Sequence, residues 1–222
     1  MQLLIVSATE MEVELLRSSL GNPVSKNKYY YNDLVVDFLI TGVGMTATAF
    51  ALGKYLVNKN YDLAINLGLA GAFDRNLKLG QVVEVFSDCF PEMGAENGKE
   101  FISISELQLQ AANAFPFENA LLNSNLPEKL YQTHRWEKVH GITVNTVHGD
   151  EASISKIESM FQPQVESMEG AAFFYACRMM DLPCIQLRSI SNYVEKRNKA
   201  AWEIDLAIRN LTDDTLFLLN DL

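Results

Sequence analysis

Hydrophobic residues gather in short runs along the chain, and polar or glycine-bearing segments separate them. Residues 2–7 form an apolar run bounded by a turn, which predicts a buried strand. Residues 10–20 then place apolar side chains at helical spacing. Residues 29–41 predict a hairpin, because aromatic and β-branched runs stand on both sides of Asn32-Asp33.

The remaining segments continue the alternation of strand and helix. Apolar or alternating runs predict further strands at residues 63–68, 80–90, 139–147 and 184–190. Amphipathic or Ala-rich runs predict helices at residues 45–57, 170–180 and 200–219. Between 91 and 137 the pattern weakens, which indicates an insertion or active-site loop region with one short helix at 127–134. The chain is therefore expected to form one α/β domain, residues 1–222, with a mixed, mostly parallel central sheet flanked by helices.

The composition limits the kinds of molecule that the chain is expected to bind. The 222 residues include 18 Lys and Arg against 28 Asp and Glu, so the net charge is −10. An acidic chain without a basic run is not expected to bind nucleic acid. Its longest charge-free stretch, 38–53, is too short and too polar to cross a bilayer. No basic region precedes the first apolar run, so we expect no export signal, no membrane partner and a cytoplasmic location.

Cysteine and histidine spacing does not favour metal binding. The three cysteines form no C-x-x-C pair, and the three histidines lack the i, i+4 spacing of a helical metal site. We therefore expect no metal and no cofactor.

Chemistry-bearing residues follow the predicted strands, where ligands of parallel α/β sheets bind. These segments are Ser7–Glu12, Thr41–Gly44, Gly68–Ala72, Glu166–Gly170 and Ser189–Asn192. Two carboxylates among them, Glu12 and Glu169, allow general acid–base chemistry and substrate positioning. Neither a serine nor a cysteine is paired with a histidine in a known nucleophile motif, so a Ser–His triad is weakly supported.

A dinucleotide site is a second interpretation of one segment. Gly42-Val43-Gly44 followed by Met45-Thr46-Ala47 gives G-x-G-x-x-A after a strand and before a helix. The acidic residue at the expected distance, Asp62, heads a strand instead of ending one. A tight turn before a helix is the better interpretation.

Motifs along almost the whole chain resemble a known family. They are Glu12, Gly42-Val43-Gly44, Asn66-Leu67-Gly68-Leu69-Ala70-Gly71-Ala72, Leu79-Gly80-Gln81-Val82-Val83, Glu166-Ser167-Met168-Glu169-Gly170-Ala171-Ala172 and Arg188-Ser189-Ile190-Ser191-Asn192. In this order they resemble the nucleosidase branch of the purine nucleoside phosphorylase superfamily, which includes the methylthioadenosine/adenosylhomocysteine nucleosidases. The resemblance implies a nucleoside phosphorylase-like fold, a small-molecule nucleoside substrate and cleavage of an N-glycosidic bond.

The resemblance also assigns roles to individual residues. Glu169 matches the carboxylate that accepts hydrogen bonds from ribose hydroxyls, and Met168 matches the residue that packs on the sugar. Glu12 matches the carboxylate that positions and deprotonates the attacking water; the alternative is a solvated residue in the first turn of a helix. Substrate contacts are expected as well from three residues of the strand-end motifs. These are Ala70, Gly71 and Ser191.

The attacking group is expected to be water. Where phosphorylases of the family place an Arg and a Ser, this chain has Asn66 and Leu69. A phosphate dianion needs cationic and hydroxyl donors, which these two side chains do not supply.

Asn192 bears on the base that is released. Adenine-cleaving relatives carry Asp at this position, whereas an amide can donate to an oxygen at C6 and accept from a protonated N7. Asn192 therefore favours a 6-oxopurine such as hypoxanthine; the alternative is that Asn192 only caps a loop.

Ser191-Asn192 followed by Val194, Arg197 and Ala201-Trp202 resembles the futalosine hydrolase subfamily. That resemblance implies release of hypoxanthine from futalosine in menaquinone biosynthesis. Adenine nucleosidase, phosphorylase and a nucleoside sensor without turnover stay open as alternatives.

The resemblance leaves three points open. The adenine nucleosidases' aromatic base-stacking residue has no counterpart here, so Phe73 or Phe90 would have to replace it. Candidates for holding the substrate's benzoate are Arg75, His148 and Arg197. A homodimer or higher homo-oligomer is implied, with the helix at 45–57 as a candidate shared surface and burial within the monomer as the alternative.

Overall fold

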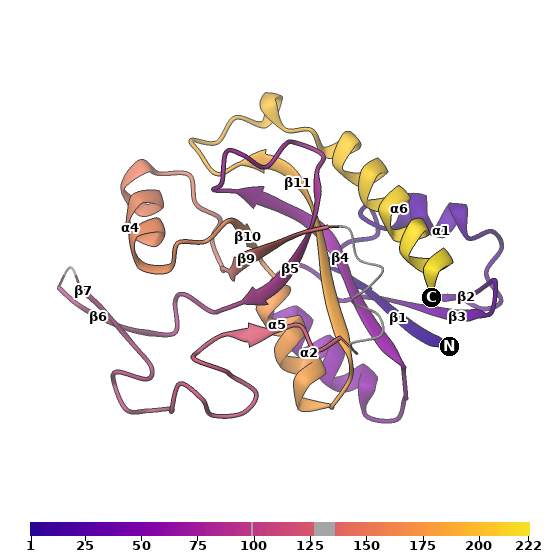
Figure 1. Ribbon diagram of the computed structural model, residues 1–222, viewed down its shortest axis with the longest axis horizontal. Coiled ribbons are helices and arrows are strands. Elements are labelled where there is room, and N and C mark those ends of the chain that lie inside the picture. Colours follow the sequence, from indigo (N-terminus) through magenta and orange to yellow (C-terminus); the bar gives the residue numbers. More distant parts are fainter. Residues whose placement is uncertain (99, 127–135) are drawn as a thin grey trace.

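A computed structural model describes residues 1–98, 100–126 and 136–222 (Figure 1). The helix predicted at 127–134 lies outside these residues. The strands are β1 Gln2–Ser7, β2 Lys28–Tyr31, β3 Leu34–Ile40, β4 Leu63–Ala72, β5 Val82–Asp88, β6 Gly94–Asn97, β7 Glu100–Ser103, β8 Leu122–Asn123, β9 Glu137–Thr143, β10 Val165–Ser167 and β11 Cys184–Tyr193. The helices are α1 Glu14–Ser19, α2 Met45–Leu56, α4 Glu151–Phe161, α5 Gly170–Met179 and α6 Ile204–Asp221, with a short 3-10 helix at Lys199–Ala201.

The main sheet has the order β10-β9-β5-β11-β4-β1-β3-β2, with β8 added to β5. Five of its strand pairings are parallel (β1–β3, β1–β4, β11–β4, β10–β9 and β5–β9), and the others are antiparallel. The predicted mixed, mostly parallel α/β sheet is confirmed.

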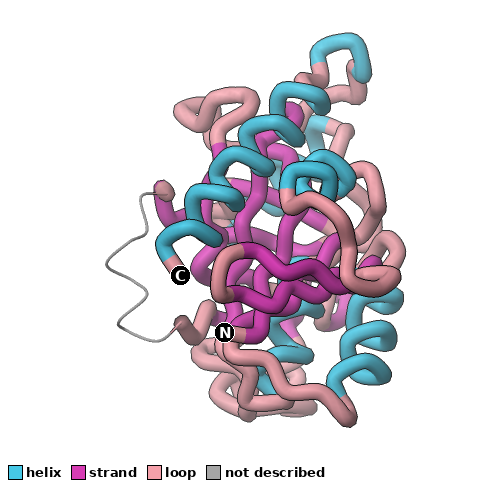
Figure 2. Tube along the Cα trace, turned by 90° about the vertical axis from the view of Figure 1, so that its right-hand side faces the viewer, coloured by secondary structure: helices cyan, strands magenta, loops and turns pink. Residues whose placement is uncertain are grey.

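Helices cover both faces of this sheet (Figure 2). Alternate side chains of β1 point to opposite faces, as the period of a strand requires. Leu3 and Ile5 pack in a core with residues of α1 and α6, whereas Leu4 and Val6 pack in a second core with residues of α2 and α5. A strand buried on both faces needs an apolar run without alternation, and residues 2–7 supply one.

The sheet closes on itself at one end. β10 pairs parallel with β9 and antiparallel with β4, at Gly71 and Ala72, so β4, β11, β5, β9 and β10 form a closed ring. This closure brings Glu166 opposite Gly71 although the two are 95 positions apart. The carboxyl ends of β4, β10 and β11 therefore meet in one place.

Several predicted boundaries were wrong. β4 and β11 continue to Ala72 and Tyr193, past the predicted ends at 68 and 190, because the two strands go on pairing with each other and β4 also pairs with β10. The helix predicted at 200–219 begins at Ile204. α4 was not predicted, since its only buried residue is Ile157 and its apolar stripe is weak. Among the described residues, no helix has the length and apolar character needed to cross a membrane.

Candidate active site

A cavity of about 450 Å³ opens where these strand ends meet. Its wall comes from the segment after β1, the ends of β4 and β11, and the turn between β10 and α5. The structure brings all seven predicted site residues to this cavity: Glu12, Ala70, Gly71, Met168, Glu169, Ser191 and Asn192.

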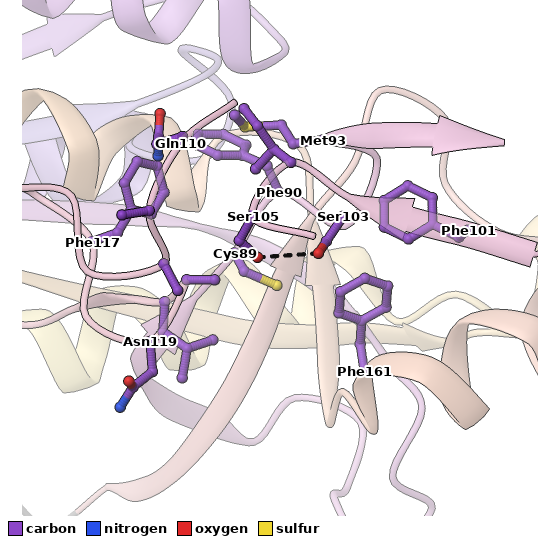
Figure 3. Close-up of a pocket in the computed structure, with 15 residues that line it drawn as sticks. Cys89, Phe90, Met93, Phe101, Ser103, Ser105, Gln110, Phe117, Asn119 and Phe161 are labelled. Carbon is purple, nitrogen blue, oxygen red and sulfur yellow. Dashed lines mark hydrogen bonds between the residues drawn. The ribbon is translucent and has the colours of Figure 1, made fainter. Parts of the chain in front are cut away.

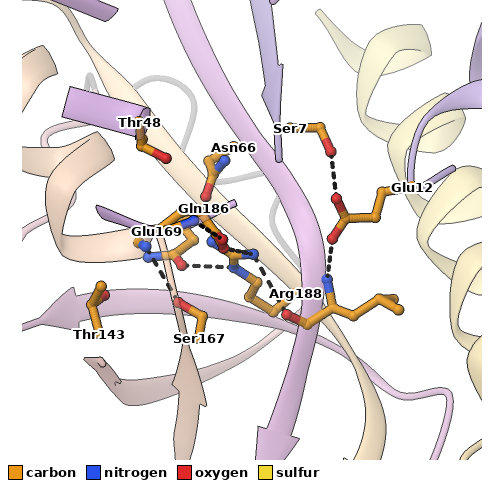
Figure 4. A network of polar contacts seen from close by, with 12 residues as sticks. Ser7, Glu12, Thr48, Asn66, Thr143, Ser167, Glu169, Gln186 and Arg188 are labelled. Carbon is orange, nitrogen blue, oxygen red and sulfur yellow. Dashed lines mark hydrogen bonds and ion pairs between the residues drawn. The ribbon is translucent and has the colours of Figure 1, made fainter. Parts of the chain in front are cut away.

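Glu12 is a buried carboxylate at one side of the cavity, not a solvated helix residue. It precedes α1, which begins at Glu14, and only 9% of it is exposed. Oε2 accepts hydrogen bonds from the hydroxyl of Ser7 at 3.0 Å and from the amide and hydroxyl of Thr9 at 3.0 and 2.8 Å. Oε1 accepts from the amide of Leu69 at 3.2 Å. Donors to both oxygens fix the carboxylate while it faces the cavity (Figure 4).

Glu169 fills the turn between β10 and α5. Its Oε1 accepts from the amide of Gly44 at 3.0 Å, and its Oε2 lies 3.6 Å from Nη1 of Arg188. Gly44 has φ +96°, a left-handed conformation that a side chain disfavours, so glycine is needed there to aim its amide at the carboxylate. The G-x-G turn thus holds Glu169. Asp62, the acidic residue considered for a dinucleotide site, accepts a hydrogen bond from the backbone amide of Gln2. The turn interpretation fits this geometry.

Arg188 is the centre of a buried polar network behind the cavity (Figure 4). Nε donates to Gln186 at 2.8 Å, and Nη2 donates to the Oδ1 of Asn66 at 2.6 Å. Asn66 in turn donates to the carbonyl of Val6 at 3.0 Å. The guanidinium of Arg188 is therefore paired with carboxylate and amide oxygens. These partners offset the free-energy cost of burying its positive charge.

The same network reaches a second buried acid. Gln186 donates to Oδ2 of Asp88 at 3.2 Å, and Thr143 donates to Oδ1 at 3.0 Å. Burial raises the pKa of Asp88 to about 6, although these hydrogen bonds and the charge of Arg188 act in the opposite direction. A Cβ on Gly170 would lie 2.2 Å from Gln186 and 2.3 Å from Asp88, so glycine at the start of α5 leaves room for the network.

Asn192 lies at a bulge near the end of β11. Its Oδ1 accepts from the hydroxyl of Ser191 at 2.8 Å, and its Nδ2 donates to the carbonyl of Tyr193 at 3.0 Å. Each atom keeps capacity for one more hydrogen bond. A Cβ on Gly71 would lie 3.3 Å from Nδ2, so the backbone of β4 closely borders this amide.

Beside Asn192 lies an acid–imidazole pair that the sequence reasoning did not identify. Nδ1 of His148 is 2.6 Å from Oε2 of Glu166, and the amide of His148 donates to Oε1 at 3.0 Å. Glu166 is 3% exposed. Burial raises its pKa, against the hydrogen bonds and charge of His148. Both residues line the cavity.

Two of the three residues considered for binding the benzoate lie at the cavity, and the third does not. His148 and Arg197 line the cavity, and the guanidinium of Arg197 lies 4.9 Å from the ring centroid of Trp202, another lining residue. Arg75 instead pairs with Glu195 at 2.8 Å and is not among the lining residues.

Neither candidate stacking aromatic lines this cavity. Phe90 lines a separate apolar cavity of about 170 Å³, whose lining residues come from 89–93, 101–105, 110–121 and Phe161 (Figure 3). Phe73 packs against the ring of His148 instead, with 6.0 Å between centroids. Cys89 borders the smaller cavity, and burial raises the pKa of its thiol to about 12, so it is not a nucleophile near neutral pH.

Comparison with known proteins gives a family match over most of the chain. The model of the Phosphorylase superfamily matches residues 2–215. Futalosine hydrolase of Thermus thermophilus is 28% identical over 177 residues, which cover 78% of this chain and 76% of that protein. The 5'-methylthioadenosine/S-adenosylhomocysteine nucleosidase of Colwellia psychrerythraea is 26% identical over 237 residues, covering 98% and 95%.

Solved structures share the fold. The native futalosine hydrolase of Helicobacter pylori aligns with TM-score 0.79 and 14% identity over 100% of this chain and 98% of that one. The Colwellia psychrerythraea nucleosidase in complex with adenine aligns with TM-score 0.82 and 22% identity over 100% and 96%.

Proposed function

The chain belongs to the Phosphorylase superfamily, and from that membership we propose that it hydrolyses the N-glycosidic bond of futalosine and releases hypoxanthine. Its relatives are named hydrolases and nucleosidases, which supports the reaction class expected from the sequence, an N-glycosidic hydrolase. The observation that carries the proposal is the pair of fixed carboxylates, Glu12 and Glu169, in one cavity with the amide of Asn192.

The geometry supports a division of labour. Breaking the bond between C1' and the base leaves positive charge on the sugar, and an ionised carboxylate stabilises that charge. We assign this task, together with the ribose hydroxyls, to Glu169, with Met168 packing on the sugar. Glu12 accepts a proton from the attacking water at Oε1, which accepts only from the amide of Leu69 and keeps acceptor capacity, whereas Oε2 already accepts three hydrogen bonds.

Water is a better attacking group here than phosphate. Four carboxylates line the cavity, and Arg197 is the only Arg or Lys among the described lining residues. A phosphate dianion would meet a strongly negative surface. Asn66 and Leu69 do not offer donors to a phosphate. The side chain of Asn66 is hydrogen-bonded to Val6 and Arg188, and the amide of Leu69 donates to Glu12.

Two features favour futalosine over other purine nucleosides. The amide of Asn192 can donate to an oxygen at C6 of the base, whereas a carboxylate would repel that oxygen. Arg197 and Trp202 lie together at the cavity wall and offer a cation and an apolar surface to an aromatic carboxylate. This chemistry suits the substrate's benzoate, and the role that we infer for the reaction is in menaquinone biosynthesis.

One finding favours a second candidate, hydrolysis of methylthioadenosine or adenosylhomocysteine. The Colwellia nucleosidase matches a larger share of the chain than the Thermus hydrolase, at similar identity. A panel of futalosine, inosine and methylthioadenosine in phosphate-free buffer separates the candidates by the base released. Hypoxanthine from futalosine is expected; adenine from methylthioadenosine alone would establish the second candidate, and turnover only with phosphate would overturn hydrolysis.

The proposal includes a homodimer. Thr48 and Leu52 of α2 are buried within the monomer, but Phe50 on the same helix is 72% exposed. Tyr175 and Met179, on α5 that packs against α2, are exposed too. We expect a second copy of this chain to bury the apolar α2–α5 surface, because exposed apolar side chains grouped on adjacent helices commonly mark an interface.

A further inference from the structure

The reaction needs a proton donor that the proposed roles do not supply. When the bond to the base breaks, its electron pair moves onto the purine, and the base leaves most easily if a proton arrives at a ring nitrogen. Asn192 can accept a hydrogen bond from a protonated N7, but an amide has no proton to give near neutral pH. Glu12 takes a proton from water and so has the opposite role.

His148 and Glu166 have the arrangement of an acid held in place by a partner. An ionised carboxylate can only accept, so Nδ1–H of His148 donates to Glu166 at 2.6 Å. This bond fixes the orientation of the ring and leaves Nε2 as the nitrogen that Glu166 does not engage. No described residue is hydrogen-bonded to Nε2, and His148 lines the cavity together with Asn192.

The pair also lies on the side of the cavity where Asn192 is. A Cβ on Gly71 would lie 3.3 Å from the amide of Asn192 and 3.6 Å from Cγ of Glu166. One residue of β4 therefore borders both groups. A base that bonds to Asn192 comes to the neighbourhood of the imidazole.

We propose that His148 is the general acid for the departing base and that Glu166 positions it; this rests on the nucleosidase function proposed above. The C1'–N9 bond breaks and its electrons pass to the purine, while N7 takes the proton from Nε2 of His148. Water forms the new bond to C1' and gives its proton to Glu12. His148 donates one proton and Glu12 accepts one, so both the released base and the sugar product are neutral where the bonds changed. Solvent then carries the proton from Glu12 back to the imidazole of His148.

Charged groups surround His148 from two sides. Glu166 is in direct contact, and Glu195 and Arg197 line the same cavity. Glu92, Glu96 and Lys156 line a smaller cavity of about 240 Å³ that His148 also borders. Carboxylates therefore outnumber cations among these neighbours of His148.

The test exploits leaving groups that need no proton. p-Nitrophenyl riboside releases a stable anion, and 7-methylinosine releases a neutral base because its N7 already carries the charge. His148→Asn keeps a donor for Glu166 but removes Nε2. His140→Asn is the matched control, since His140 is exposed on β9 and does not line the cavity.

Selective loss is the expected result. His148→Asn should lower kcat on futalosine by about 100-fold or more, with less than about threefold loss on the two activated substrates, and Glu166→Gln should show the same selectivity with a smaller loss. His140→Asn should match the wild type. Equal loss on all substrates, or a loss below threefold on futalosine, overturns the proposal. If the wild type releases no base from any purine nucleoside, the proposed function fails instead.

Discussion

Asp88 makes the stability of the protein depend on pH in a way that one substitution can isolate. It is fully buried in the network that ends at Glu169, and burial raises its pKa from 3.8 to about 6. A carboxyl with a raised pKa in the folded state favours folding while it is protonated. Its contribution is complete below pH 3.8 and is lost as the pH rises through 6.

The size of the effect follows from the shift. A difference of about 2 pKa units corresponds to about 3 kcal/mol of unfolding free energy between low and neutral pH. About 1.4 kcal/mol of this falls between pH 5 and pH 8, where the acid is titrating in the folded protein and is already mostly ionised in the unfolded chain. Asp88→Asn removes the titration. The misfit of an amide opposite Gln186 adds an offset that does not change with pH.

Urea denaturation of both proteins at several pH values between 5 and 8 measures this difference. Relative to Asp88→Asn, the wild type should lose about 1 to 2 kcal/mol over the range. Asp213 on α6 is exposed and provides the control variant Asp213→Asn. Its unfolding free energy should change with pH as that of the wild type does. Parallel curves for Asp88→Asn would mean that Asp88 does not titrate in this range, and the reasoning from its burial would be wrong.

Four other substitutions test the site and the surface. Glu12→Gln should lower kcat by about 10²-fold or more and leave the Kd for futalosine within about threefold, because it removes a base and keeps the shape; unchanged turnover would refute the role. Asn192→Asp should shift preference toward 6-amino purines in kcat/KM, and no shift would leave Asn192 as a structural amide. Gly68→Ala would place a Cβ 2.1 Å from Nη1 of Arg188, so unfolding free energy should fall by about 1–3 kcal/mol. Phe50→Glu should give a monomer in analytical ultracentrifugation; a dimer unchanged in affinity would place the interface elsewhere.

Much of the site could be predicted because it is local in sequence. Glu12, Met168 and Glu169 each lie within five residues of the end of a strand, and the order of motifs that resembles a known family grouped them. The strand ends were harder to predict, since Ala70 and Gly71 have the composition of a loop. Pairing with β11 and β10 keeps them in the sheet.

The acid–imidazole pair could not be predicted in this way. Glu166 and His148 are 18 positions apart, and neither belongs to a periodic pattern. Their contact depends on the closure of the sheet by β10, a strand of three residues that carries almost no signal of its own. Arg188 is similar: a strand arginine usually faces solvent, and only the tertiary arrangement of Asn66, Gln186 and Glu169 explains its burial.

The most direct measurement is a single turnover experiment in ¹⁸O-labelled water without phosphate. Purified protein is incubated with futalosine, and the base and the sugar product are analysed by mass spectrometry. Hydrolysis at the proposed site predicts free hypoxanthine together with one ¹⁸O atom in the sugar product. Absence of hypoxanthine, or its appearance only after phosphate is added, would contradict the proposed function.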